Sequence, residues 1–388
     1  MKPKTPNSHD KSAALYVHIP FCLSKCRYCS FCSFPRGNYN IDGYVEALLQ
    51  QTRDMGVHPW SREHRFTTLF IGGGTPTILN ADQLPTLIAT LLASYAFVPD
   101  AEITIEANPN TIDLPKLQAL RQAGVNRLSI GIQALDDGLL HKIGRTHTVR
   151  EGMEAFRAAR KAGFDNINLD LIYGLPDQTP DLWAQTLNKA CELSPEHFSV
   201  YELMVEEGSV FAERQDQGTL TLPGDAEMEQ MEQLRRDIFA ERGYNRYEIS
   251  NFCRDEKQCR HNIQYWRNRS YLGLGAGAVS CLSGIRLRNL SDPQQFTDCL
   301  EHGIPPYADA ECLSRRARFR ETVIMGLRLL EGIDIEDLTN RFGFSPTDYY
   351  GETLNKLIDD KLINIEKEYM KLTTKGLPLA NRILAELV

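Results

Sequence analysis

The sequence predicts an α/β fold built on a parallel sheet, followed by a smaller helical domain. The chain has 388 residues, which is beyond the size at which one hydrophobic core usually stops growing, so two domains are expected. Short β-rich segments recur along the first half, separated by helix-like segments, and this alternation is typical of βαβ units. Such units suit either a partial barrel or a doubly wound sheet, and both place functional groups at the carboxyl ends of the strands.

Six segments rich in β-branched and other apolar residues are the predicted strands. They are residues 14–20, 67–74, 102–109, 127–134, 166–174 and 197–203. Between them, residues 113–124 and 150–163 carry apolar side chains at helical spacing and end at a glycine, which predicts a helix in each case. Cysteine, glycine and polar residues follow several of the strands directly. Because these strand ends share one edge of the sheet, a single site is expected there.

Beyond about residue 205 the alternation weakens. Residues 206–227 are expected to form a long loop, and residues 227–243 an amphipathic helix. Residues 244–253 and 270–282 contain further strand-like segments.

The last part of the chain is mainly helical. Residues 320–332, 334–343 and 350–362 are predicted helices, and residues 363–376 resemble a two-stranded wing before a last helix, so a winged-helix-like domain is expected. Residues 316–388 hold eleven Lys and Arg against twelve Asp and Glu, which argues against DNA binding. The predicted divisions are a flexible lead (1–13), a barrel with an extension (14–290), a connector (291–315) and a C-terminal domain (316–388).

The composition is that of a globular protein without a membrane anchor. The formal net charge of −8 argues against a nucleic-acid partner. No apolar stretch approaches the roughly 18 residues of a membrane span, and the first residues lack the apolar core of a signal peptide. A cytoplasmic location is therefore expected. Thiols stay reduced there, so clustered cysteines indicate metal binding or catalysis rather than disulfides.

Four of the ten cysteines lie within eleven positions, at Cys22, Cys26, Cys29 and Cys32. The first three form a C-x3-C-x2-C pattern, and Cys32 offers a fourth thiolate. A closed zinc site takes four ligands, whereas a [4Fe–4S] cluster held by three thiolates keeps one iron open for a ligand. Four cysteines this close together lack the two separated pairs that are usual in zinc motifs, so the pattern favours an iron–sulfur cluster over zinc.

Two motifs together, YVHIPFCLSKCRYC (16–29) and IGGGTP (71–76), resemble the signature of the radical S-adenosylmethionine (SAM) superfamily. More narrowly, the chain is similar to the branch of oxygen-independent coproporphyrinogen III oxidases and HemW-like heme chaperones. The likeness continues through IEANPNTID (105–113), NINLDLIYGLPDQT (166–179) and RYEISNFCRDEKQCRHNIQYW (246–266). It implies a partial (β/α)6 barrel with appended strands and a smaller C-terminal domain.

The resemblance also implies the cofactors and their ligands. Cys22, Cys26 and Cys29 would hold the [4Fe–4S] cluster, whose open iron would chelate SAM and supply the electron that cleaves it. The positions implied in contacts with SAM or the cluster are Tyr16, Tyr28, Gly73, Gly74, Thr75, Glu106, Gln133, Arg145 and Asp170. Their chemistry is suitable, because glycines allow close backbone approach and an arginine can pair with the methionine carboxylate. Any one of these residues alone would more often be a turn, a cap or a packing residue.

The segment HNIQYW (261–266) fits the chaperone branch, in which its histidine is implicated in heme binding. A neutral imidazole is a good axial ligand of heme iron, which makes His261 a candidate ligand. The alternative is that His261 and Asn262 fasten a loop over the barrel mouth. Cys32 departs from both patterns, since the oxidases have C-x-C here and the chaperones usually have no cysteine. It could be a substitute ligand, a redox-sensitive neighbour or a small packing residue.

These features predict a radical SAM-fold heme chaperone that binds heme as cargo and passes it to an acceptor hemoprotein. The alternative is a radical SAM oxidoreductase that acts on a tetrapyrrole, such as a coproporphyrinogen III dehydrogenase, and that needs an electron donor. An iron–sulfur regulator that binds DNA through the C-terminal domain is a third hypothesis, disfavoured by the charge balance of that domain. Whether the protein is an enzyme stays open at this point.

Overall fold

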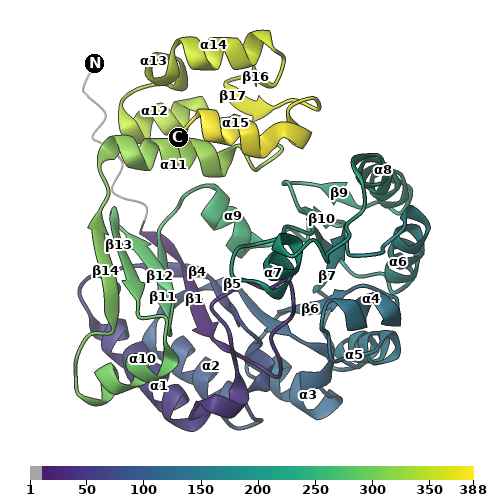
Figure 1. Ribbon diagram of the computed structural model, residues 1–388. Helices are drawn as coiled ribbons and strands as arrows, with labels where there is room; N and C mark the ends of the chain where they lie inside the picture. Colours follow the sequence, from purple (N-terminus) through teal and green to yellow (C-terminus); the bar gives the residue numbers. More distant parts are fainter. Residues whose placement is uncertain (1–10) are drawn as a thin grey trace.

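A single curved sheet of twelve strands dominates the computed structural model, which describes residues 11–388 (Figure 1). Six strands in its middle are neighbours in chain order and run parallel. They are β1 (Ser12–Ile19), β4 (Arg65–Gly73), β5 (Ala96–Ala107), β6 (Arg127–Gln133), β7 (Ile167–Tyr173) and β8 (His197–Glu202). A doubly wound sheet needs a reversal of strand order, and this series has none. The α/β prediction is therefore confirmed, in the form of the partial barrel.

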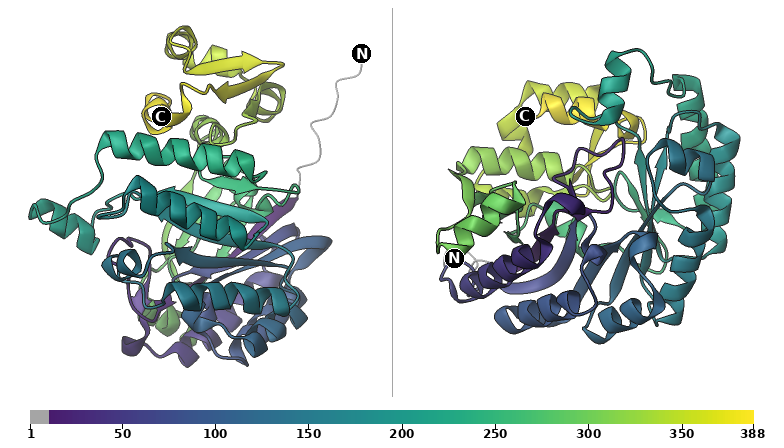
Figure 2. Two further views of the ribbon diagram at one scale, coloured as in Figure 1. Left: turned by 90° about the vertical axis from the view of Figure 1, so that its right-hand side faces the viewer. Right: turned by 60° about the horizontal axis from the view of Figure 1, so that its bottom comes forward.

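Helices cover the outer side of the barrel (Figure 2). The long ones are α1 (Ile41–Val57), α2 (Gln83–Ser94), α3 (Leu114–Gln122), α5 (Val149–Lys161), α6 (Pro180–Glu192) and α8 (Asp225–Glu241), with a short α4 (Asp137–Lys142). Several begin at a side chain that satisfies a free backbone N–H, such as Thr148, which forms a capping box with Glu151. Their apolar faces pack on strands that are buried almost throughout, and this contact forms the main core.

Both edges of the barrel are extended by further strands. Beyond β8 lie β10 (Asn251–Cys253) and β9 (Asn245–Arg246), both antiparallel to their neighbours. Beyond β1 lie β11 (Tyr271–Leu274), which is parallel to it, and then the antiparallel strands β12 (Val279–Leu282), β13 (Ile285–Asn289) and β14 (Tyr307–Cys312). Helix α10 (Pro293–Glu301) packs against α1. These are the appended strands that were expected.

Three expectations about local structure differ from the fold. The segment 206–227 is not one long loop, because it contains α7 (Val210–Asp216), which Ser209 caps by accepting a hydrogen bond from the backbone of Ala212. Strand β5 begins at Ala96, six residues before the expected start. Of the flexible lead expected over residues 1–13, the part up to residue 10 lies outside the described residues, and β1 already begins at Ser12.

The C-terminal domain packs helices around a small antiparallel sheet, as expected of a winged-helix-like domain. Its helices are α11 (Arg315–Gly326), α12 (Ile335–Phe342), α13 (Pro346–Tyr350), α14 (Glu352–Asp359) and α15 (Ala380–Glu386), and its sheet has the order β15 (Ile333–Asp334), β17 (Tyr369–Leu372), β16 (Ile363–Glu366). It has its own core around Phe319. The backbone of Leu330 donates to Tyr247 O at 3.0 Å and so joins this domain to the barrel. Within residues 11–388, no helix is both long and apolar enough to cross a membrane.

Candidate functional site

The loop that carries the clustered cysteines follows β1 at the carboxyl end of the barrel and is held by backbone hydrogen bonds. At its base, β2 (Phe21–Cys22) pairs with β3 (Phe34–Pro35). In its middle, Arg27 N donates to Ile143 O at 3.0 Å, and Arg27 O accepts from Phe211 N at 3.0 Å. The loop is therefore positioned by protein contacts on both sides.

Three of the four cysteines are near enough for their charges to interact. The Cys22 thiol accepts from Thr75 Oγ1 at 3.6 Å, and the Cys26 thiol accepts from Arg145 Nη1 at 3.6 Å. Burial raises the pKa of Cys22, and the nearby Cys26 and Cys29 thiols raise it further, so a thiolate there needs a compensating cation. Arg145 supplies part of that positive charge.

Cys32 lies apart from the other three. Its thiol donates to Ser291 O at 3.5 Å and lies against Gly277, where an added Cβ would be 2.8 Å from the sulfur. Burial raises the pKa of Cys32, and none of the other three cysteines is among the groups that shift it. The position is that of a small side chain packed between two segments.

In the described part of the chain, no three His, Cys, Asp or Glu side chains meet at a position for one metal ion. A zinc ion needs its ligands around one point, whereas each thiolate of a [4Fe–4S] cluster binds a different iron. Three neighbouring but spread thiols beside a cationic side chain therefore fit a cluster better than they fit zinc.

The glycines after β4 lie directly against the base of the cysteine loop. Gly73 has a φ of +119°, and a Cβ there would lie 2.7 Å from the His18 ring. At Gly74, a Cβ would lie 2.6 Å from Phe21 O and 2.9 Å from the Cys22 sulfur. The next residue, Thr75, contacts Cys22 as described. Only glycine fits these positions, so this backbone can approach a ligand beside Cys22 closely.

The end of β6 brings Gln133 and Arg145 together above Gly131. Arg145 Nη2 donates to Gly131 O at 2.6 Å, and its Nε is buried without a partner. Gln133 has a φ of +68°, which is uncommon for a residue with a side chain and often marks a constrained position. Tyr28 packs in a cluster around α4, and its pKa is raised by burial and by the Cys26 thiol, while Arg145 opposes the rise. Arg145 thus keeps a donor available at the cysteine loop.

Two carboxylates on the inner face of the barrel continue the site. Glu106 Oε2 accepts from Gly73 N at 3.1 Å, and burial, together with the charge of Asp170, raises its pKa to about 8. Asp170 accepts from Asn168 Nδ2 at 2.7 Å and from Ser129 Oγ at 3.2 Å, and burial raises its pKa as well. Partly buried carboxylates of this kind are suited to a ligand with positive charge or hydroxyl donors.

The raised pKa of Glu106 predicts a pH-dependent stability. Between its usual pKa near 4.5 and the folded value of about 8, the folded protein binds this proton and the unfolded chain does not. The free energy of unfolding of the cofactor-free protein should therefore fall as the pH rises from 5 to 8, by up to about 1.4 kcal/mol per pH unit from this group. Thermal unfolding of Glu106→Gln should show a shallower fall than wild type. The exposed Glu229→Gln should follow wild type, and parallel curves for wild type and Glu106→Gln would contradict the assignment.

A cavity of about 180 Å³ lies inside the barrel below these groups. Tyr16, Glu106 and Asp170 line it from the strands, and His261 closes it from α9 (Arg260–Trp266) at the amino ends of the strands. His261 is 1% exposed. Its Nδ1 shares a hydrogen bond with Thr68 Oγ1 at 2.8 Å, and its Nε2 is buried without a partner. Burial, and then the charge of Arg127, lower the pKa of His261 to about 3, so its ring is neutral.

The structure thus brings the three cysteines, Gly73, Gly74, Thr75, Gln133, Arg145, Glu106 and Asp170 to the carboxyl half of the barrel, with Tyr16 in the cavity below. His261 lies at the other end of the same cavity, and its ring and backbone hold helix α9 to the amino ends of the strands, rather than a loop over the barrel mouth. Heme ligation by His261 stays a prediction.

Several residues that line the cavity were missed from the sequence. They are Phe70, Arg127, Ser129, Asn168, Ser199 and Tyr201. Their signal is alternation, because side chains two residues apart on a strand share a face. Asn168 lies two residues before Asp170, and Ser129 and Arg127 lie four and six residues before Gln133. Counting back in twos from each recognised strand end would have found them.

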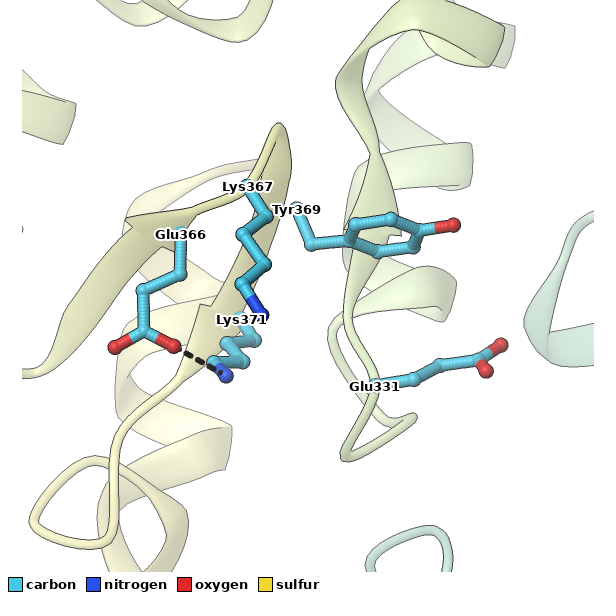
Figure 3. Close-up of a pocket in the computed structure, with 5 residues that line it drawn as sticks. All are labelled: Glu331, Glu366, Lys367, Tyr369 and Lys371. Carbon is cyan, nitrogen blue, oxygen red and sulfur yellow. Dashed lines mark ion pairs between the residues drawn. The ribbon is translucent and has the colours of Figure 1, made fainter.

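A larger hollow, of about 300 Å³, lies on the C-terminal domain between Glu331 and the β16–β17 hairpin (Figure 3). It is lined by Glu331, Glu366, Lys367, Tyr369 and Lys371, and Lys371 Nζ is 2.7 Å from Glu366 Oε2. Four of these five side chains are charged, and none of the five is buried. The chemistry described above lies in the barrel, so the site is assigned there.

A partial barrel of six parallel strands with a three-cysteine loop at their carboxyl ends defines a radical SAM protein. The family model of the radical SAM superfamily matches residues 16–190, and that of the HemN C-terminal domain matches residues 313–379. Among solved structures, the chain is similar to the coproporphyrinogen III oxidase HemN from Escherichia coli, a radical SAM enzyme. The TM-score is 0.84 at 28% identity, over 97% of this chain and 90% of the other.

Within this superfamily, the curated relatives include heme chaperones named HemW. The protein from Lactococcus lactis is 36% identical over 373 residues, which are 96% of each chain. The protein from Bacillus subtilis is 35% identical over 369 residues, 95% of this chain and 97% of the relative. The chain belongs to the HemW family. Its membership in the radical SAM superfamily implies a [4Fe–4S] cluster and SAM as cofactors.

Proposed function

We propose that this protein is a heme chaperone that binds a [4Fe–4S] cluster, SAM and heme and delivers the heme to an acceptor hemoprotein. The observation that carries the proposal is the cysteine trio seated against Gly73–Thr75 and Arg145, in a chain similar to HemW over nearly its full length. A cytoplasmic location belongs to the same proposal. All ten cysteines are unpaired, as in a reducing compartment.

In this proposal Cys22, Cys26 and Cys29 hold the cluster, which when bound supplies an iron open to SAM and an electron from an external donor. Arg145 takes the methionine carboxylate, for which it has a buried Nε without a partner. The backbone at Gly73 and Gly74 lies along the amino-acid part of SAM. Glu106 and Asp170 accept from its amino and hydroxyl groups. Gln133, Thr75, Tyr28 and Tyr16 complete the walls that exclude water.

For heme, the proposal assigns a contact to His261. Its Nε2 is the atom that lacks a protein partner, and its low pKa keeps the ring in the neutral form. A cavity of about 180 Å³ is smaller than the roughly 300–1,000 Å³ of typical ligand pockets, so it holds only part of a macrocycle. The porphyrin ring would then lie mostly outside the barrel.

The test that separates the chaperone from an oxidase is a product assay. Protein reconstituted anaerobically with iron and sulfide is given SAM, a reductant and coproporphyrinogen III, and in parallel is titrated with hemin. We expect stoichiometric hemin uptake, followed by transfer to an apo-hemoprotein with a distinct absorption band, and no vinyl-bearing porphyrin. A vinyl product would establish the oxidase alternative. The structural similarity to HemN is the reason for testing it.

A further inference from the structure

Arg127 is a buried cation with no protein partner. It begins β6, is 2% exposed and lines the cavity inside the barrel. Its Nε is completely buried without a partner, and within residues 11–388 its guanidinium forms neither a hydrogen bond nor an ion pair. The N–H at Nε is removed from water without a replacement, and the four N–H groups at the Nη atoms have no protein acceptor among the described residues, so an acceptor is expected in the cavity.

The buried carboxylates near Arg127 are already used. Glu102 and Asp170 interact with Arg127 through their charges, but neither forms an ion pair with it. Glu102 instead accepts from the backbone of Arg260 at 2.9 Å and of His261 at 3.0 Å, which fixes α9. Asp170 accepts from two side chains on β6 and β7, as described. The free donors of Arg127 are therefore directed into the cavity rather than toward these groups.

The end of the cavity beside Arg127 is suited to one acidic group, whereas Glu106 and Asp170 line the cavity toward the carboxyl half of the barrel. Tyr16, Phe70 and His261 form one aromatic wall, with ring centroids 6.2 Å apart for the first pair and 5.0 Å for the second. His261 Nε2 is a second unpartnered polar atom in the same cavity, and it donates if Thr68 gives its hydroxyl proton to Nδ1. Tyr201, another lining residue, is 42% exposed, so the cavity opens to solvent on the β8 side.

We propose that the inner end of this cavity is a carboxylate subsite, in which Arg127 is the counter-ion and His261 Nε2 a second donor for one propionate arm of the bound heme. This inference rests on the proposed function. A propionate is narrow enough for a cavity that excludes the macrocycle, and the ring would lie at the mouth near Tyr201. His261 then contacts the carboxylate and not the iron.

The test compares hemin with hemin dimethyl ester, in which both carboxylates are masked. Absorbance titrations of the reconstituted protein should show hemin binding roughly tenfold tighter than the ester, because a charge-assisted hydrogen bond is lost in the ester. Arg127→Met should bind the two within about twofold of each other. Arg127→Lys keeps the charge and should retain part of the preference. The matched control is Arg150→Met, whose side chain is 82% exposed and which should behave as wild type.

Two comparisons complete the test. The preference for hemin over the ester separates a ligand-binding role of Arg127 from a structural one, and the SAM affinity shows whether the ligand of Arg127 is heme or SAM. Arg127 offsets the charges of Glu102 and Asp170, so Arg127→Met should lower the unfolding temperature whatever its role, whereas a purely structural arginine would leave the preference for hemin over the ester unchanged. SAM affinity should be unchanged in Arg127→Met. A loss of SAM binding would mean that the carboxylate belongs to SAM and would overturn the inference, as would equal hemin and ester binding in wild type. A wild-type protein that takes up no hemin would instead contradict the proposed function and the inference with it.

Discussion

Serine at Cys22, Cys26 or Cys29 is expected to abolish the cluster in each single variant. Each thiolate of a three-cysteine site binds its own iron, and an alcohol is a poor replacement for a soft thiolate. Anaerobically reconstituted variants should lack stoichiometric iron and acid-labile sulfide, lose the broad absorption near 400 nm, and bind SAM without an iron contact. Iron and sulfide analysis with a SAM-binding assay measures all three effects.

The matched control for these variants is Cys32→Ser in the same loop. Its thiol contacts Ser291 O and not the other cysteines, and a serine hydroxyl can donate to the same carbonyl. Cys32→Ser should therefore keep full iron and sulfide content. If Cys32→Ser lost the cluster while one of the other three variants kept it, the assignment of the ligands would be wrong.

After the cysteine variants, Gly74→Ala should have the largest effect on stability and SAM binding, because there is no space for the added methyl group. Its Cβ would lie 2.6 Å from Phe21 O and 2.9 Å from the Cys22 sulfur, and both belong to the base of the cysteine loop. Overpacking of this kind costs about 1–3 kcal/mol. If the cysteine loop moved to relieve this steric overlap, Cys22 would be displaced. We therefore expect a lower unfolding temperature and at least about tenfold weaker SAM binding.

Gly37→Ala provides the comparison for Gly74→Ala, since a Cβ at Gly37 meets no atom within 4 Å. It should match wild type in thermal unfolding and in SAM affinity. Wild-type behaviour of Gly74→Ala itself would show that the loop tolerates displacement, and would argue against tight contact between the glycines and the cofactor.

The residue pattern was sufficient for the six central strands, and the family resemblance supplied the barrel and the candidate residues of the cysteine loop. Buried parallel strands are continuous apolar runs, which made all six recognisable, and the residues at their carboxyl ends carry local motifs. The short helix α7 was missed, because its seven residues give little periodicity and its stability comes from the cap at Ser209 and the burial of Phe211. The early start of β5 was missed because Ala96–Asp100 is only partly apolar and pairs with β4 over a register shift.

The inner end of the cavity could not be predicted, since its residues meet only through the tertiary fold. Arg127 is one arginine among many in the sequence, and its lack of a partner depends on how Glu102 is occupied by α9. The separation of Cys32 from its three neighbours likewise depends on Ser291, more than 250 residues away in the chain. Spacing along the sequence carries no information about such contacts.

The place of β1 in the sheet has a consequence for biosynthesis. This strand has β4 on one side and β11 on the other, with Ala14 opposite Tyr271, so one of its neighbours is made about 250 residues after it. At a ribosomal rate of roughly 5–20 residues per second, that neighbour arrives on the order of ten to fifty seconds later. For much of its translation, the nascent chain therefore carries exposed thiols next to a sheet that still lacks β11. Cluster insertion is expected to follow the synthesis of β11, so pulse-labelling with radioactive iron should label stalled nascent chains that include Tyr271–Leu274 and not shorter ones.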